Sequence, residues 1–258
     1  MGANNIRLLS RIIDRSLPEI YPLCSKISRL DMLDFCWMLK SAGAGIIEIS
    51  PEILAIMGKL PEGLDFIVRA RTADDMGLCA RSRVKRIVVG KALLESGAVG
   101  LIKDGGFTVV LEVRINSVDG LCRLERLPEL PSFPLAGCVR ILGLDAAASD
   151  EWLDAARKVR SVTGRMLDIC IGNTFSMGTS TSLEGITGGM DFVTASFGGY
   201  GNFTPLEELL SALKARYGEM PEADAGALKK LGDFVSGHVR RRPVPKPDAD
   251  KRIFAAGQ

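Results

Sequence analysis

The stretch that most constrains the fold covers residues 166–208, where strand-like and helix-like segments alternate. Residues 166–171 form an apolar run of the length of a buried strand, and residues 192–197 form a second one. Residues 177–188 lie between them and carry apolar side chains near helical spacing. Thr204, as a cap residue, and Pro205 begin another helix. Such alternation predicts parallel strands joined by right-handed crossovers, with chemistry in the loops that follow the strands.

The same alternation continues through the rest of the chain. Six further segments have strand character, at residues 11–14, 45–50, 64–70, 86–90, 107–113 and 138–142, and the clearest other helices fall at 28–43, 73–82, 150–163, 206–217 and 225–239. Eight units in 258 residues match a TIM barrel, for which about 250 residues is typical. We predict an α/β, single-domain TIM (β/α)8 barrel over residues 1–220. Residues 221–258 are expected to form a C-terminal helix and a basic, proline-rich tail packed on the barrel.

Composition excludes several other classes of protein. Hydrophobic residues make up 47% and charged residues 25%, which is typical of a globular protein. No apolar run approaches the roughly 20 residues of a membrane span, and residues near the N-terminus lack the pattern of a signal peptide, so secretion is not expected. The formal charge of +2 does not favour nucleic acid binding. Six cysteines without C-x-x-C spacing indicate reduced thiols. We therefore expect a cytoplasmic protein that binds neither membrane nor nucleic acid.

Residues 170–183 and 199–208 carry recognisable motifs. The pattern H-x-H-N-D-x-G-x-A-x-A-N-T/S-L aligns without a gap onto the first segment, with Cys170 and Gly172 in place of the histidines and Asn173 and Leu183 retained. The second segment is similar to a G-x-G-E-R-x-G-N-x-x-L-E-E loop, shortened before Asn202. The chain thus resembles the homocitrate synthase, isopropylmalate synthase and HMG-CoA lyase family of metal-dependent TIM barrels.

Residues 12–19 resemble the first motif of that family, I-x-D-T-T-L-R-D-G. Asp14, Ser16 and Leu17 agree, but Pro18 replaces the arginine and Glu19 replaces the metal-binding aspartate. The resemblance implies that the arginine stabilises an enolate, and proline offers neither charge nor donor for that role. Arg15 is not expected to replace it, because side-chain directions alternate along a strand.

Glu48 and Arg69 are two further candidates. Residues 45–50 resemble the family's G-V-x-x-I-E-x-G segment, and the spacing from Arg69 to Asp74 matches its R-A-x-x-x-D segment. A carboxylate in so apolar a strand is either a site residue or a paired core charge, so both interpretations of Glu48 stay open. We expect Glu19, Glu48, Arg69 and Cys170, the candidate catalytic residues, to converge with Asn202 at the carboxyl ends of the strands.

The resemblance implies four metal-ligand positions, occupied here by Glu19, Cys170, Gly172 and Asn202. Glycine supplies no side-chain ligand, and a thiol is a poor ligand for magnesium or manganese. The sole histidine, His238, falls in a helix beyond the last strand, where packing is its expected role. We expect no cofactor. Any divalent metal should bind weakly, with zinc preferred and Cys170 as the main ligand.

The arginine, both histidines and the loop acid of the family are replaced together, whereas residues that suit packing and turns remain. This pattern favours the family fold without the family chemistry: a pseudoenzyme with a degenerate metal site, acting as partner or regulatory subunit of an active homocitrate or isopropylmalate synthase in a homo- or hetero-oligomer. One alternative is an acyltransferase or an aldolase-type lyase that acts on a 2-oxo acid or acyl-CoA. A second is a small-molecule binding module. The tail at residues 240–247 is either a packed arm or a grip for phosphate or an acidic partner.

Overall fold

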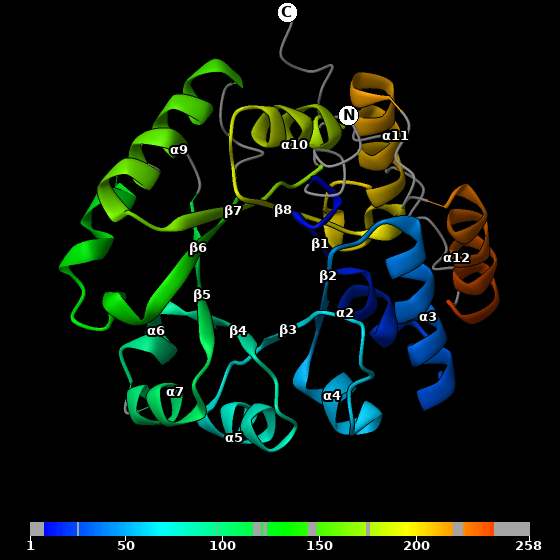
Figure 1. Cartoon of the computed structure of the whole chain (residues 1–258), viewed down its shortest axis with the longest axis horizontal. Coiled ribbons are helices and arrows are strands. Elements are labelled where there is room, and N and C mark those ends of the chain that lie inside the picture. The colour runs from blue at the N-terminus through cyan, green and yellow to red at the C-terminus, as the bar shows by residue number, and fades with distance from the viewer. Residues whose placement is uncertain are drawn as a thin grey trace, which may run out of the picture.

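Eight parallel strands form a closed barrel in the order β1 to β8, with β8 paired to β1 (Figure 1). The computed structural model describes residues 8–24, 26–96, 98–115, 120, 123–143, 149–173, 176–218 and 224–239. The strands are β1 Ile12–Asp14, β2 Ile46–Ile49, β3 Phe66–Arg69, β4 Arg86–Gly90, β5 Thr108–Arg114, β6 Ala136–Leu142, β7 Met166–Cys170 and β8 Phe192–Ala195. The predicted TIM barrel is confirmed.

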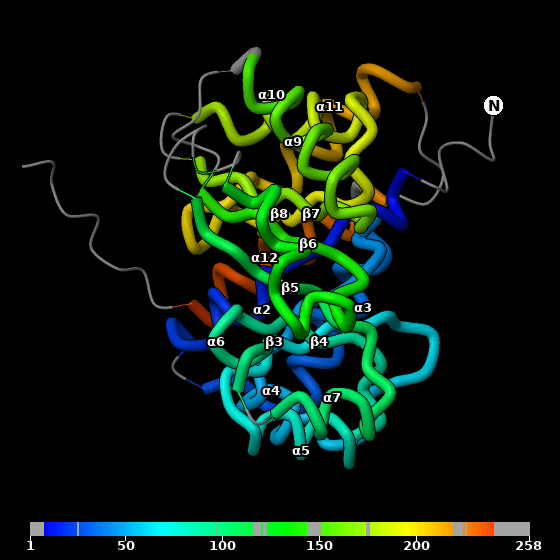
Figure 2. Tube along the Cα trace, turned by 90° about the vertical axis from the view of Figure 1, so that its left-hand side faces the viewer, coloured from blue at the N-terminus to red at the C-terminus, as the bar shows by residue number. Residues whose placement is uncertain are grey.

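Helices surround the barrel on the outside. They are α2 Ser16–Ile20, α3 Arg29–Ala42, α4 Pro51–Met57, α5 Ala73–Arg81, α6 Lys91–Leu94, α7 Val99–Gly105, α9 Ser149–Thr163, α10 Gly178–Thr187, α11 Leu206–Tyr217 and α12 Ala225–His238. Short 3-10 turns occur at η1 Tyr21–Leu23, η2 Leu124–Glu129, η3 Phe133–Leu135 and η5 Phe197–Asn202. In the view turned by 90°, α4, α5 and α7 lie below the strands and α9 to α11 above them (Figure 2). No described helix is long and apolar enough to span a bilayer.

Local sequence signals explain the best-defined helix, α3. Ser28 and Asp31 form a reciprocal capping box, in which each side chain accepts a hydrogen bond from the other residue's backbone N–H. Gly43 ends the helix in the left-handed conformation, with φ of 114°, which glycine adopts without a Cβ clash. Helix α12 packs against α3 through Phe35 and Phe234, whose ring centroids lie 5.1 Å apart.

Two local predictions were wrong. Thr204 does not cap α11, because Pro205 occupies the N-cap position and the Thr204 hydroxyl is hydrogen bonded to Ser182 instead. The segment after β1 is not a plain loop but the short helix α2. The tail at residues 240–247 and Cys122 lie outside the described residues. The other five cysteines are free thiols.

The barrel interior contains two layers of side chains that we name by their chemistry. The apolar layer, near the amino ends of the strands, consists of Ile13, Ile46, Ile67, Val88, Val110 and Cys138, with Phe192 packed against it. The ionic layer, nearer the carboxyl ends of the strands, consists of Glu48, Arg69, Glu112, Arg140, Asp168 and Thr194. Side chains two residues apart on a strand point the same way, so both layers face inward. A larger apolar core fills the space between the strands and the helices.

Candidate functional site

Arg140 is the central residue of the ionic layer. Its side chain is fully buried, and it donates hydrogen bonds from Nε to Asp168 and from Nη1 to Glu48. Asp168 also accepts a hydrogen bond of 3.0 Å from the Thr194 hydroxyl. Three different strands, β2, β6 and β7, are thereby joined through one guanidinium group.

Arg69 extends this network toward β5. Its Nε donates to Glu48 at 3.0 Å. Its Nη1 donates to Oε1 of Glu112 and its Nη2 to Oε2 of the same carboxylate. Such a two-pronged pairing fixes the planes of both groups as well as their distance. Glu48 is therefore a paired core charge. It also borders the barrel mouth, so its two interpretations, as a site residue and as a paired core charge, are compatible.

Burial and ion pairing compete in setting the charge of the ionic layer. Burial by itself raises the pKa of Glu48, but Arg140, Arg69 and Arg15 outweigh it and lower that pKa to about 2. Burial also raises the pKa of Asp168, an effect that Arg140 and the hydrogen bond from Thr194 oppose. Among the described residues Asp168 has Arg140 as its one arginine partner, so loss of Arg140 would leave the buried Asp168 charge unpaired.

A pocket of about 480 Å³ opens above the ionic layer at the carboxyl ends of β1, β2 and β3. Three arginines and three acids line it: Arg15, Arg69, Arg71, Glu19, Glu48 and Glu52. Arg15 donates from Nε to Glu19 at 2.8 Å and lies 3.7 Å from the Glu48 carboxylate. Arg15 therefore lies at the site, although whether it replaces the family's arginine stays a prediction. Strand β1 ends at Asp14, so strand alternation no longer sets its direction, and helix α2 places Glu19 four residues along on the same face.

Asp14 lies at the exit of β1 and is fully buried. Its carboxylate accepts hydrogen bonds from the Ser16 backbone N–H at 2.9 Å and from the Ser16 hydroxyl at 2.7 Å. The Ser16 oxygen in turn accepts a hydrogen bond from the Phe197 N–H at 2.6 Å. Burial raises the pKa of Asp14 to about 7, although the hydrogen bonds from Ser16 oppose the shift. The retained Asp14 and Ser16 thus tie the β1 exit to the glycine-rich turn η5.

The four positions that the resemblance assigns to metal ligands have different surroundings. The Glu19 carboxylate is held by Arg15, and Gly172 contributes only backbone, as a bridge to Phe203. Cys170 is buried, and burial raises the pKa of its thiol to about 12, so the thiol is protonated at neutral pH. The Asn202 carbonyl accepts the Asn173 N–H. Among the described residues, no group of three or more His, Cys, Asp or Glu side chains is arranged to hold a metal ion.

The predicted convergence of candidates is seen most directly for Glu48 and Arg69, which are hydrogen bonded, and for Glu19, which reaches them through Arg15. Glu19 also lies against the last loop, since a Cβ added to Gly201 would come within 2.6 Å of its carboxylate. Cys170 ends β7 at the same end of the barrel. His238 is not part of this site; it stacks on Phe234 with ring centroids 4.1 Å apart.

Comparison with known proteins found a curated relative by sequence and several solved structures with a similar fold. No family model matches the chain. It is 24% identical over 213 residues to the homocitrate synthase omega subunit of Clostridium pasteurianum, a match that covers 79% of this chain and 58% of the relative. The predicted family resemblance is confirmed. This homocitrate synthase-like barrel spans less than two thirds of the length of that curated relative.

Solved structures share the fold at low sequence identity. HMG-CoA lyase from Pseudomonas aeruginosa superposes with a TM-score of 0.71 at 14% identity, covering 88% of this chain and 92% of that one. The carboxyl transferase domain of Rhizobium etli pyruvate carboxylase gives 0.69 at 12%, covering 90% and 48%. A putative aldolase from Bacteroides vulgatus gives 0.68 at 14%, covering 88% and 86%.

Four members of the ionic layer of this homocitrate synthase-like barrel were not predicted: Glu112, Arg140, Asp168 and Thr194. Each is a polar residue between apolar neighbours in a short strand, as in Leu167-Asp168-Ile169. The same signal singled out Glu48, so it was available at these positions too. What the sequence lacks is the pairing, because Glu48 and Arg140 are 92 residues apart.

Proposed function

We propose that this chain is a non-catalytic barrel subunit that assembles with an active synthase of the homocitrate or isopropylmalate type. The curated relative is described as an omega subunit of homocitrate synthase, which supports a place in an enzyme of several subunits. The barrel frame is retained, while the positions expected to hold a metal carry Glu19, Cys170, Gly172 and Asn202.

The observation that carries this proposal is the saturation of the acids by arginines. Glu19 is paired with Arg15, Glu48 with Arg69 and Arg140, Glu112 with Arg69, and Asp168 with Arg140. A divalent cation would have to displace these partners and would then face the remaining guanidinium charges in a poorly solvated interior. The Cys170 thiol, with a pKa of about 12, adds little at neutral pH.

The isolated chain is expected to show no homocitrate or isopropylmalate synthase activity. Pro18 occupies the position of the oxyanion-stabilising arginine, and loss of one such donor typically lowers the rate about 100- to 1,000-fold. Release of free CoA from acetyl-CoA with 2-oxoglutarate or 2-oxoisovalerate measures this directly. Release above a blank without the second substrate would overturn the non-catalytic assignment.

Assembly is tested by affinity capture of the tagged chain from native extract, followed by identification of the captured synthase. We expect a synthase-type chain that retains the H-x-H motif to co-purify in fixed ratio and to change its rate of CoA release when this chain is added back. Recovery of no synthase, or of this chain alone, would count against the subunit role.

Metal titration separates this proposal from a working metal enzyme. We expect zinc to bind weakly and Cys170→Ser to abolish that binding, because the thiol is the only soft ligand of the four positions. Cys138→Ser is the matched control, since Cys138 is equally buried but belongs to the apolar layer. Stoichiometric, tightly held manganese or magnesium in the purified protein would contradict the proposal.

A second candidate function rests on the mouth pocket, where Arg15 and Arg69 are paired with acids but Arg71 makes no ion pair among the described residues and is available to an anionic ligand such as a 2-oxo acid or an acyl-CoA. Turnover would make the chain an acyltransferase or an aldolase-type lyase, and binding without turnover would make it a ligand-binding module. We expect 2-oxoglutarate to raise the melting temperature, and Arg71→Gln to remove that shift. Arg81→Gln, on the outer helix α5, serves as the control. Product formation then distinguishes turnover from binding.

A further inference from the structure

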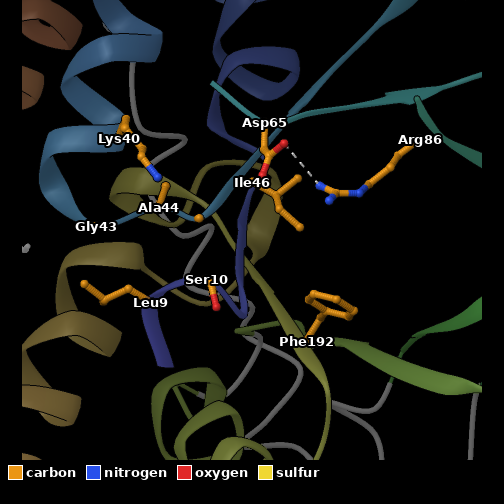
Figure 3. A pocket seen from close by; sticks show the side chains of 10 residues that line it. Leu9, Ser10, Lys40, Gly43, Ala44, Ile46, Asp65, Arg86 and Phe192 are labelled. Carbon is orange, nitrogen blue, oxygen red and sulfur yellow. Dashed lines mark ion pairs between the residues drawn. The ribbon is translucent and has the colours of Figure 1, made fainter. Parts of the chain in front are cut away.

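A second pocket lies at the opposite end of the barrel, around the amino ends of the strands. It has a volume of about 640 Å³, within the range of small-molecule sites. Ile46 and Phe192, the first residues of β2 and β8, line it together with Leu9 (Figure 3). Ile46 and Phe192 also belong to or pack against the apolar layer, so the inner wall of the pocket is apolar.

The pocket is kept open by small residues before β2. Gly43, Ala44 and Gly45 form part of its lining. A Cβ added at Gly45 would lie only 2.6 Å from the Leu9 carbonyl oxygen, so any side chain there would push the two segments apart. The backbone donors of this turn are already used, since the N–H groups of Gly43 and Gly45 donate to the carbonyls of Lys40 and Ile12. Polar recognition in the pocket must therefore come from side chains.

Two cationic side chains reach the pocket from opposite sides, Lys40 from α3 and Arg86 from β4 (Figure 3). The facing acid is Asp65, whose Oδ1 lies 3.7 Å from Arg86 Nη1, beyond hydrogen-bond distance. That Nη1 is buried and has no hydrogen-bond partner among the residues described. The Lys40 ammonium makes no ion pair with any residue that the structure describes. The pocket thus combines an excess of positive charge with an apolar wall.

We propose that this pocket binds a small organic anion with an apolar body, a carboxylate or a phosphate ester. The anionic group lies between Lys40 and Arg86 and is held by their two positive charges. The apolar body rests on Ile46 and Phe192. The site is separate from the barrel mouth and does not depend on the proposed subunit role.

The probes are benzoate, phenyl phosphate and the neutral benzyl alcohol, observed by saturation-transfer NMR on the full chain. Benzoate or phenyl phosphate is expected to bind with a Kd on the order of 1 mM, and benzyl alcohol more weakly by a factor of about ten or more. Arg86→Gln and Lys40→Gln should each weaken anion binding about tenfold, as expected for loss of one charge-assisted contact. Lys59→Gln is the matched control, because Lys59 lines the neighbouring pocket but not this one.

The pattern of binding decides the proposal and its chemistry. Binding of benzoate assigns the site to carboxylates, and binding of phenyl phosphate alone assigns it to phosphate esters. Failure of both probes to bind overturns the proposal, as does equal binding of benzyl alcohol or unchanged binding in both Arg86→Gln and Lys40→Gln. Should Arg86→Gln not fold, Lys40→Gln carries the test, since its ammonium makes no described contact that folding needs.

Discussion

Strand β2 carries Ile46 and Glu48 on the same face, two residues apart, in very different surroundings. Ile46 belongs to the apolar layer, where aliphatic side chains and a thiol from six strands meet. Glu48 belongs to the ionic layer, where it contacts Arg69 and Arg140. Ile46 and Glu48 are both buried, so the contrast between them lies in chemistry rather than in burial.

The two layers tolerate change differently for a physical reason. Each apolar side chain contributes about 1.5–3 kcal/mol on burial, nearly independently of its neighbours' identity. A buried ion pair contributes little net stability, because desolvation offsets the attraction, but removal of one partner is strongly destabilising. The apolar layer should therefore weaken in small steps, and the ionic layer should respond abruptly.

The largest expected effect is that of Arg140→Met. This change leaves Glu48 and Asp168 buried without their shared partner and should lower the free energy of unfolding by about 3–5 kcal/mol. Urea denaturation followed by circular dichroism measures the change. Arg157→Met is the matched control, because its pair with Asp154 is exposed and should contribute less than about 1 kcal/mol. Similar losses in the two variants would remove the distinction between the layers.

The pH dependence of stability provides the second test, with Glu48→Gln. The folded-state pKa of Glu48 is lowered from 4.5 to about 2, so its ionised form stabilises the fold above pH 4.5, and that contribution is lost as pH falls toward 2. The stability difference between wild type and Glu48→Gln should shrink across this window by at most about 3 kcal/mol. Ile67→Val should run parallel to wild type over the same range. A constant difference for Glu48→Gln would show that its charge does not matter.

Ile67→Val probes the apolar layer directly. Removal of one buried methylene group should lower the free energy of unfolding by about 0.5–1.5 kcal/mol, with no change in denaturant slope. Urea titration at neutral pH is sufficient. A loss as large as that of Arg140→Met would mean that both layers respond abruptly.

Arg86→Gln should have the smallest effect on stability. The Arg86–Asp65 pair is 3.7 Å long and exposed on the Asp65 side, so the change should be below about 1 kcal/mol. Thermal unfolding measures it. A larger loss would indicate that Arg86 stabilises the barrel at the amino ends of the strands and is not available to a ligand.

Much of the fold could be predicted, and less of the site. The capping box at Ser28 and Asp31 marks α3 through contacts only three residues apart, which is why that helix was located accurately. Glu48 was recognised by its polar character in an apolar strand. The position of Arg15 at the mouth was not predicted, because its direction depends on where β1 ends, and the sequence does not mark that residue.

The sequence by itself determined the order of strands and helices, since periodicity, caps and glycine stops act within a few residues of one another. It also determined that two of the positions assigned to metal ligands carry a thiol, at Cys170, and no side chain, at Gly172. Only the tertiary structure decided that Arg140 pairs with both Glu48 and Asp168. It also decided that Ile46 and Phe192, which are 146 positions apart in the sequence, line one pocket. Closure of the barrel brings strands from distant parts of the chain to one axis, where charge, burial and pKa depend on partners that no local pattern specifies.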